Sequence, residues 1–68
     1  MINRYNIIIK EKYGTYQIEA RLSGMYLVWN ECEDGKWVGL ASVKTPIAAH
    51  KIIGAYEDYL QVVEETVD

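Results

Sequence analysis

The segment Lys44-Thr45-Pro46-Ile47-Ala48-Ala49 decides the fold, because the spacing of apolar residues changes there. Before it, apolar and polar residues mostly alternate, most cleanly from Thr15 to Leu22. After it, apolar residues recur at helical spacing, at Ala49, Ile52, Ile53, Tyr56, Leu60 and Val63. Side chains alternate between faces along a strand and return about every 3.6 residues on a helix. The sequence therefore predicts an α+β fold, a three- or four-stranded antiparallel sheet with one C-terminal helix packed on one face (β-β-β-α).

The predicted helix runs from Pro46 to about Glu65. Thr45 suits the N-cap, because its hydroxyl can accept a hydrogen bond from a first-turn N–H, and Pro46 suits the first helical position. Gly54 interrupts the helix, either because another backbone approaches there or because the helix tolerates it at a cost of about 1 kcal/mol. The outward face is expected to carry the polar residues His50, Lys51, Glu57, Asp58, Gln61, Glu64 and Glu65.

Two strands are predicted at the start of the chain. The first spans roughly Arg4 to Lys12 and is followed by a turn at Tyr13-Gly14, where glycine accepts a positive φ. The second spans Thr15 to Leu22. The residues expected to share one face of the first strand are Tyr5, Ile7 and Ile9. Those expected to point inward from the second are Tyr16, Ile18, Ala20 and Leu22.

The dipeptide Ser23-Gly24 leaves the number of strands open. It is either a tight turn into a further strand, which gives four strands, or a bulge within one long bent strand, which gives three. We favour three strands, because the residues on both sides keep strand character.

A hairpin is predicted from Met25 to Val43, because Asp34-Gly35 lies between two β-rich runs. A two-residue loop would place Trp29 and Trp37 on opposite faces, whereas a three-residue loop beginning at Glu33 would place them on one face. Large apolar groups occupy both faces of the hairpin in either register. Because one helix covers only one face, the other is expected to contact a partner or a second copy.

Composition limits the classes of protein that fit. The 68 residues form one domain, residues 1–68, and half of them are hydrophobic, which favours self-association into a homodimer through the uncovered face. The single cysteine, Cys32, indicates a reducing, cytoplasmic location, and no apolar run is long enough for a signal peptide or membrane span. Residues 45–68 carry one basic and five acidic side chains, which makes nucleic acid an unlikely direct ligand.

No motif in the chain predicts catalysis, a cofactor or a metal site. Nucleophilic catalysis needs a nucleophile beside an oriented base, and no motif surrounds the only histidine, His50, or the serines. The segment Glu31-Cys32-Glu33-Asp34 is rich in metal-binding groups, but adjacent strand residues point to opposite faces and converge poorly. We therefore expect a protein that is not an enzyme and needs no cofactor.

Three resemblances to known families can be named. The run Asp34 to Val38, followed by a polar cap and the helix Ala48 to Tyr56, resembles the hairpin-plus-helix half of HicB-type antitoxins, with Tyr5 to Gly24 as the opening strand pair. The β-β-β-α order resembles a double-stranded-RNA-binding domain without its first helix. That family's lysine cluster corresponds here to Lys44-Thr45-Pro46-Ile47-Ala48, which contains one lysine. In size, acidity and architecture the chain is most similar to small phage-encoded inhibitors of bacterial defence, anti-CRISPR proteins among them.

These observations predict a non-enzymatic protein-binding protein. The expected role is a phage or mobile-element inhibitor that occludes a surface of a defence or host protein, in the host cytoplasm. The alternative is a HicB-like antitoxin or a nucleic-acid-associated regulatory domain. The predicted partner-binding residues are the sheet aromatics Tyr26, Trp29 and Trp37, because such residues dominate interface energetics, and then the acidic residues Glu57, Asp58, Glu64 and Glu65.

Overall fold

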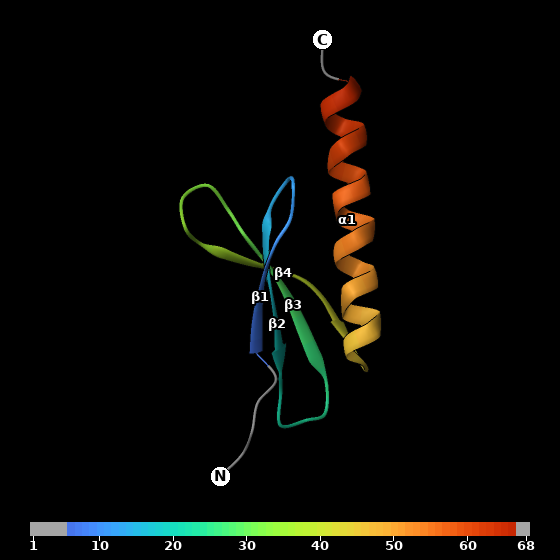
Figure 1. The fold of residues 1–68 in the computed structure, drawn as a ribbon. Helices are drawn as coiled ribbons and strands as arrows, with labels where there is room; N and C mark the ends of the chain where they lie inside the picture. Colours follow the sequence, from blue (N-terminus) through green and yellow to red (C-terminus); the bar gives the residue numbers. More distant parts are fainter. Residues whose placement is uncertain (1–5, 67–68) are drawn as a thin grey trace.

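The computed structural model describes residues 6–66 and confirms the α+β fold, with four antiparallel strands and one C-terminal helix. The strands follow chain order across the sheet, β1-β2-β3-β4, and the helix lies along one face of it (Figure 1). The elements are β1 (Asn6–Lys10), β2 (Thr15–Ala20), β3 (Tyr26–Glu31), β4 (Trp37–Val43) and α1 (Pro46–Thr66). The predictions for Arg4 and Tyr5 fall outside the described residues.

The core lies between the middle of the sheet and the first half of α1. Tyr16, Ile18 and Val28 are fully buried, and they meet Ala49 and Ile53 of the helix. Further apolar residues are packed around this cluster: Ile7, Ile9, Tyr26, Leu40, Val43, Ile52 and Tyr56. The inward residues of the strands and of the helix therefore form one apolar layer. Tyr16 and Ile18 belong to it, as the sequence predicts.

The chain makes a tight turn at Ser23-Gly24, so the preference for three strands is wrong. The Arg21 N–H donates to the carbonyl of Met25 at 2.8 Å, and the Gly24 N–H donates back to the carbonyl of Arg21 at 2.9 Å. Gly24 has a φ of 91°, a conformation that side chains other than glycine rarely adopt. Leu22 lies in this turn and is 67% exposed, so the prediction that it points inward is also wrong.

Gly14 serves a different purpose from the one predicted, because its φ is not positive. In the β1–β2 turn the Glu11 N–H donates to the Gly14 carbonyl at 2.8 Å. A Cβ on Gly14 would lie 3.1 Å from both the Tyr16 hydroxyl and the Asn30 side-chain nitrogen. A side chain on residue 14 would therefore be crowded, since two polar side chains approach the backbone closely.

The β3–β4 hairpin has the three-residue loop, Glu33-Asp34-Gly35. The Cys32 N–H donates to the carbonyl of Lys36 at 2.7 Å, and Gly35 has a φ of 85°. Trp29 pairs with Gly39 and Glu31 with Trp37, so both tryptophans point to one face. The register shifts between Val28 and Trp29, which leaves Leu40 as an extra residue in β4 whose side chain packs against the core.

The helix begins as predicted and continues past the sheet. The Ala48 N–H donates to Thr45 Oγ1 at 3.1 Å, which confirms the N-cap. Apart from the neighbouring helix backbone, no atom of the described residues lies within 4 Å of a Cβ built on Gly54, so tolerance, not close approach, explains this glycine. Figure 1 shows the last turns of α1 rising beyond the hairpins, and there Val63 is 38% exposed, in contrast to the prediction that it points inward.

Candidate functional site

The face of the sheet opposite α1, here called the outer face, is the candidate site. Its residues alternate along each strand with the core residues Tyr16, Ile18 and Val28, and α1 covers only the other face. The outer face mixes apolar and polar side chains, namely Ile8, Gln17, Glu19, Leu27, Trp29, Trp37 and Ser42. An apolar sheet face without a covering layer is a common feature of interaction surfaces.

Trp29 is held in a fixed position on the outer face. Its indole Nε1 donates to Glu19 Oε1 at 3.1 Å, and the same oxygen lies 3.3 Å from Nε of Arg21. On the neighbouring strand, a Cβ on Gly39 would lie 3.7 Å from the Trp29 ring, so the indole lies beside this glycine at ordinary contact distance. The ring is half-buried and its polar edge is satisfied within the chain.

Trp37 is the more exposed tryptophan, with 36% of its surface accessible. It lies at the start of β4, where it pairs with Glu31 of β3. Trp29 is two residues before Glu31 in β3, so the two tryptophans share the outer face. Within residues 6–66 no group accepts a hydrogen bond from its indole N–H. Trp37 therefore offers both apolar area and a free donor to a partner.

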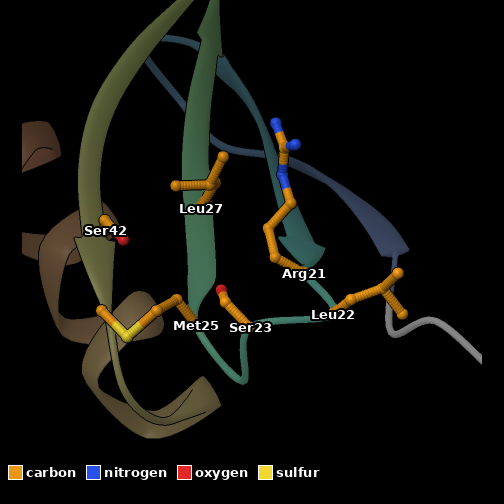
Figure 2. A pocket seen from close by; sticks show the side chains of 6 residues that line it. All are labelled: Arg21, Leu22, Ser23, Met25, Leu27 and Ser42. Carbon is orange, nitrogen blue, oxygen red and sulfur yellow. The ribbon is translucent and has the colours of Figure 1, made fainter.

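A hollow of about 520 Å³ opens on the outer face beside the β2–β3 turn. Figure 2 shows its lining side chains on the near side of the sheet, with the helix behind. Leu22, Met25 and Leu27 provide apolar surface, and Ser23, Ser42 and Arg21 provide polar groups. No sequence pattern predicted this hollow. The signal was present as apolar residues on both sides of Ser23-Gly24, which become exposed once that dipeptide is recognised as a turn.

The structure brings together two of the three predicted aromatic site residues. Trp29 and Trp37 share the outer face. Tyr26 lies on the opposite, helix-facing side, where it pairs with Ala20 and Val43 and packs against the core. A partner that contacts the tryptophans on the outer face would not contact Tyr26 at the same time.

The predicted acidic residues do not form one cluster. Glu57 Oε1 accepts a hydrogen bond from the Tyr13 backbone N–H at 3.0 Å, and its Oε2 accepts one from the Tyr16 hydroxyl. The prediction that Glu57 points outward is therefore wrong, because its carboxylate joins α1 to the β1–β2 turn. Asp58, Glu64 and Glu65 are exposed on the helix, as predicted.

Tyr16 is a structural residue, although a buried tyrosine beside a carboxylate can resemble a catalytic pair. Burial raises the pKa of the Tyr16 hydroxyl well above its ordinary value of 10.0, and the hydrogen bond and negative charge of Glu57 raise it further. The hydroxyl is fully buried and stays protonated at neutral pH. Tyr16 also contacts Tyr56 edge to face, with ring centroids 6.1 Å apart, so it anchors the helix.

Other kinds of site find little support in the described part of the chain. Among residues 6–66, no three His, Cys, Asp or Glu side chains are grouped so that they could hold a metal ion. The one helix in that range is too polar to cross a membrane. No protein-family model, curated protein or solved structure matches the chain. Its function is therefore inferred from the geometry of its surfaces.

Proposed function

We propose that the chain is a non-enzymatic protein-binding protein whose outer face covers a surface of a partner protein. The observation that carries this proposal is the position of Trp29 and Trp37 together on the sheet face that α1 leaves uncovered. Tryptophan is enriched among the residues that contribute most to interface affinity, because it buries a large apolar area and donates one hydrogen bond.

The two tryptophans would make different contributions to binding. Trp29 is already held by its hydrogen bond to Glu19, so its contact with a partner costs little further conformational entropy. Trp37 retains an exposed ring, and its indole N–H has no acceptor within residues 6–66, so it gains most from burial. The hollow lined by Leu22, Met25 and Leu27 lies on the same face and can accept an apolar side chain of the partner.

Within this proposal, the partner is a host or defence-system protein whose working surface is occluded, as the resemblance to phage-encoded inhibitors implies. The net charge of −3 supports a partner with basic groups. Asp58, Glu64 and Glu65 lie on α1, on the other side of the sheet, and are not part of this contact. Occlusion requires only a stable contact, so it is consistent with a chain that has no motif for catalysis.

Site-specific photo-crosslinking in cells tests which surface binds. A photoreactive amino acid replaces Trp37 in one variant and Tyr59 in the control, because Tyr59 is an aromatic residue of α1 that is 59% exposed. We expect a discrete adduct with one protein from position 37 and none from position 59. Equal adducts from both positions, or adducts from position 59 alone, would contradict the assignment of the outer face.

Inhibition is tested separately from binding. In a bacterial strain whose CRISPR immunity blocks a phage, expression of the chain is expected to restore plaque formation. The variant Trp37→Ala is expected to lose this effect while its far-UV circular dichroism is unchanged, whereas Tyr59→Ala keeps it. If plaques are not restored but the crosslink at position 37 persists, the partner lies outside this defence system and only the binding proposal stands.

A further inference from the structure

The free edge of β1 carries backbone groups with no partner in the sheet. The strand order leaves β1 paired on one side only, with β2. Antiparallel residue pairs alternate between hydrogen-bonded and non-hydrogen-bonded, and the bond from Glu11 N–H to the Gly14 carbonyl fixes this alternation. Ile7 and Ile9 therefore bond to β2. The N–H and C=O groups of Asn6, Ile8 and Lys10 point away from the sheet.

Within residues 6–66, this edge has none of the usual protection against further strand pairing. Edge strands in soluble proteins commonly carry a proline, a bulge or a central charge, or are covered by a helix or loop. The interior of β1 is Ile7-Ile8-Ile9, and its only charged residue, Lys10, stands at its end. Among the described residues, α1 contacts β2, β3 and β4 but not β1. The opposite edge, β4, contains the bulge at Leu40 and packs against α1.

We propose that β1 pairs antiparallel with β1 of a second copy of this chain, with the two-fold axis at Ile8, so that the two sheets become continuous. Ile8 then faces the partner's Ile8, and Asn6 faces the partner's Lys10. Each of these pairs exchanges two backbone hydrogen bonds. The 54% exposed side chain of Ile8 is covered on the outer face by its own symmetry mate.

The register itself argues for a second copy as the occupant. Asn6, Ile8 and Lys10 present the outward backbone groups, so these residues must face one another across the edge, and this allows a two-fold axis at any residue of β1. The axis at Ile8 alone pairs all five residues of β1. This axis also keeps Lys10 of each copy away from Lys10 of the other. The partner's Lys10 faces Asn6, which pairs with Glu19, so it lies two strand spacings, or about 10 Å, from this oppositely charged residue. On the helix side, Ile7 meets the partner's Ile9, so apolar residues face apolar residues across the axis.

This dimer differs from the one that the sequence predicts, because the contact is a strand edge and the outer face remains available. β1 and the Trp37-bearing β4 lie at opposite edges of the sheet. The inference therefore does not depend on the proposed partner-binding function. Failure of one proposal leaves the other unaffected.

Sedimentation velocity across a dilution series tests the edge contact. We expect a dimer for the unmodified chain and a dissociation constant raised more than about tenfold in Ile8→Lys, because two like charges would face each other at the axis. The matched control is Leu22→Lys, an equally polar change at an apolar residue that is 67% exposed and lies in the β2–β3 turn. A monomer at every concentration, or an unchanged dimer in Ile8→Lys, would overturn the proposal.

A crosslinking experiment tests the register even if Ile8→Lys folds poorly. In a Cys32→Ser background, Ile8→Cys is expected to form a covalent dimer with a short bismaleimide. Asn6→Cys is the control, because its two copies would be separated by four residues along the strands, about 13 Å. Equal crosslinking of both variants would reject this register. Dissociation of the dimer by Trp37→Ala would instead place the contact on the outer face.

Discussion

At the scale of single residues, one contact joins the two halves of the fold. The carboxylate of Glu57 binds the Tyr13 backbone and the Tyr16 hydroxyl, which lie 44 and 41 residues away in the sequence. Gly14 makes room for this arrangement, because a Cβ there would lie only 3.1 Å from the Tyr16 hydroxyl. The sequence places Glu57 among polar helix residues and gives no sign that its carboxylate would turn back to a strand turn. Only the docked position of the helix decides that.

The raised pKa of Tyr16 predicts a specific loss of stability in alkali. The unfolded chain loses this proton near the ordinary pKa of 10.0, before the folded chain does, so deprotonation favours unfolding only above that pH. The free energy of unfolding is expected to fall by up to about 1.4 kcal/mol per pH unit there, and to be unaffected by this group below it.

Urea unfolding of Tyr16→Phe measures this effect. The variant should be less stable at neutral pH by about 1.5–3 kcal/mol, because a hydrogen bond to a carboxylate is lost, but its stability should fall less steeply above pH 10. Tyr59→Phe keeps Tyr16 and is expected to keep the steep fall. An identical pH profile in Tyr16→Phe and the unmodified chain would show that Tyr16 does not cause the loss.

Two glycines are expected to respond to alanine with opposite signs. Gly54 lies within the helix with open space around it, so Gly54→Ala should stabilise the fold by up to about 1 kcal/mol, or about 4–8 °C in Tm. Gly35 also has open space, but its φ of 85° is strained for alanine, so Gly35→Ala should lower the Tm. Differential scanning calorimetry of both variants checks this. A fall in the Tm of Gly54→Ala would indicate a neighbour at this position.

At the scale of elements, the sequence predicts the type and order of the strands and the helix well. It predicts less well which face of the sheet each side chain occupies. The change of period at Thr45-Pro46 locates the helix within one residue of its observed ends. The length of the β3–β4 loop is harder to predict, because Asp34-Gly35 fits loops of two or three residues. These two loop lengths place the tryptophans on opposite faces and on one face, respectively. The outcome depends on the positive φ of Gly35 and on the extra residue Leu40, which no local pattern specifies.

The N-cap of α1 is expected to contribute more than the hydroxyl at its other end. Thr45→Ala removes the acceptor for the Ala48 N–H, and should cost about 1 kcal/mol, or about 4–8 °C in Tm. The control is Thr66→Ala, whose hydroxyl donates to the exposed carbonyls of Val62 and Val63. Thermal melts followed at 222 nm compare the two variants. Equal losses in both would argue against a specific role for the cap.

At the scale of the whole molecule, the fold is long and thin, with extents of 51 × 24 × 15 Å. The sequence predicts a sheet covered on one face, but it cannot show that the helix is longer than the sheet it covers. Val63 has the right spacing for the core and yet lies beyond it. The hollow beside the β2–β3 turn also depends on Ser23-Gly24 being a turn, because a bulge in one long strand would not form it.

Removing the end of the helix should therefore cost less stability than a small change in the core. A chain that ends after Gln61 loses Val62 and Val63, which are 56% and 38% exposed, and should unfold at nearly the same Tm. Ile53→Val removes one methylene from a residue that is 3% exposed, and should cost about 0.5–1.5 kcal/mol. Chemical unfolding of both ranks the two effects. A larger loss from the truncation would show that the terminal turns pack against the domain.

The agreement between strand order and chain order has a consequence for synthesis on the ribosome. Each strand pairs with the one made just before it, so the whole sheet can assemble while the chain is still emerging. Its apolar face then has no cover until α1, which follows β4 in the chain, has left the ribosome and packed onto it. During that interval Tyr16, Ile18 and Val28 are open to the solvent and to other nascent chains. Slow translation or a stop before Pro46 would therefore leave an aggregation-prone partial chain with an exposed apolar sheet face. Chaperones must bind this species or proteases must degrade it.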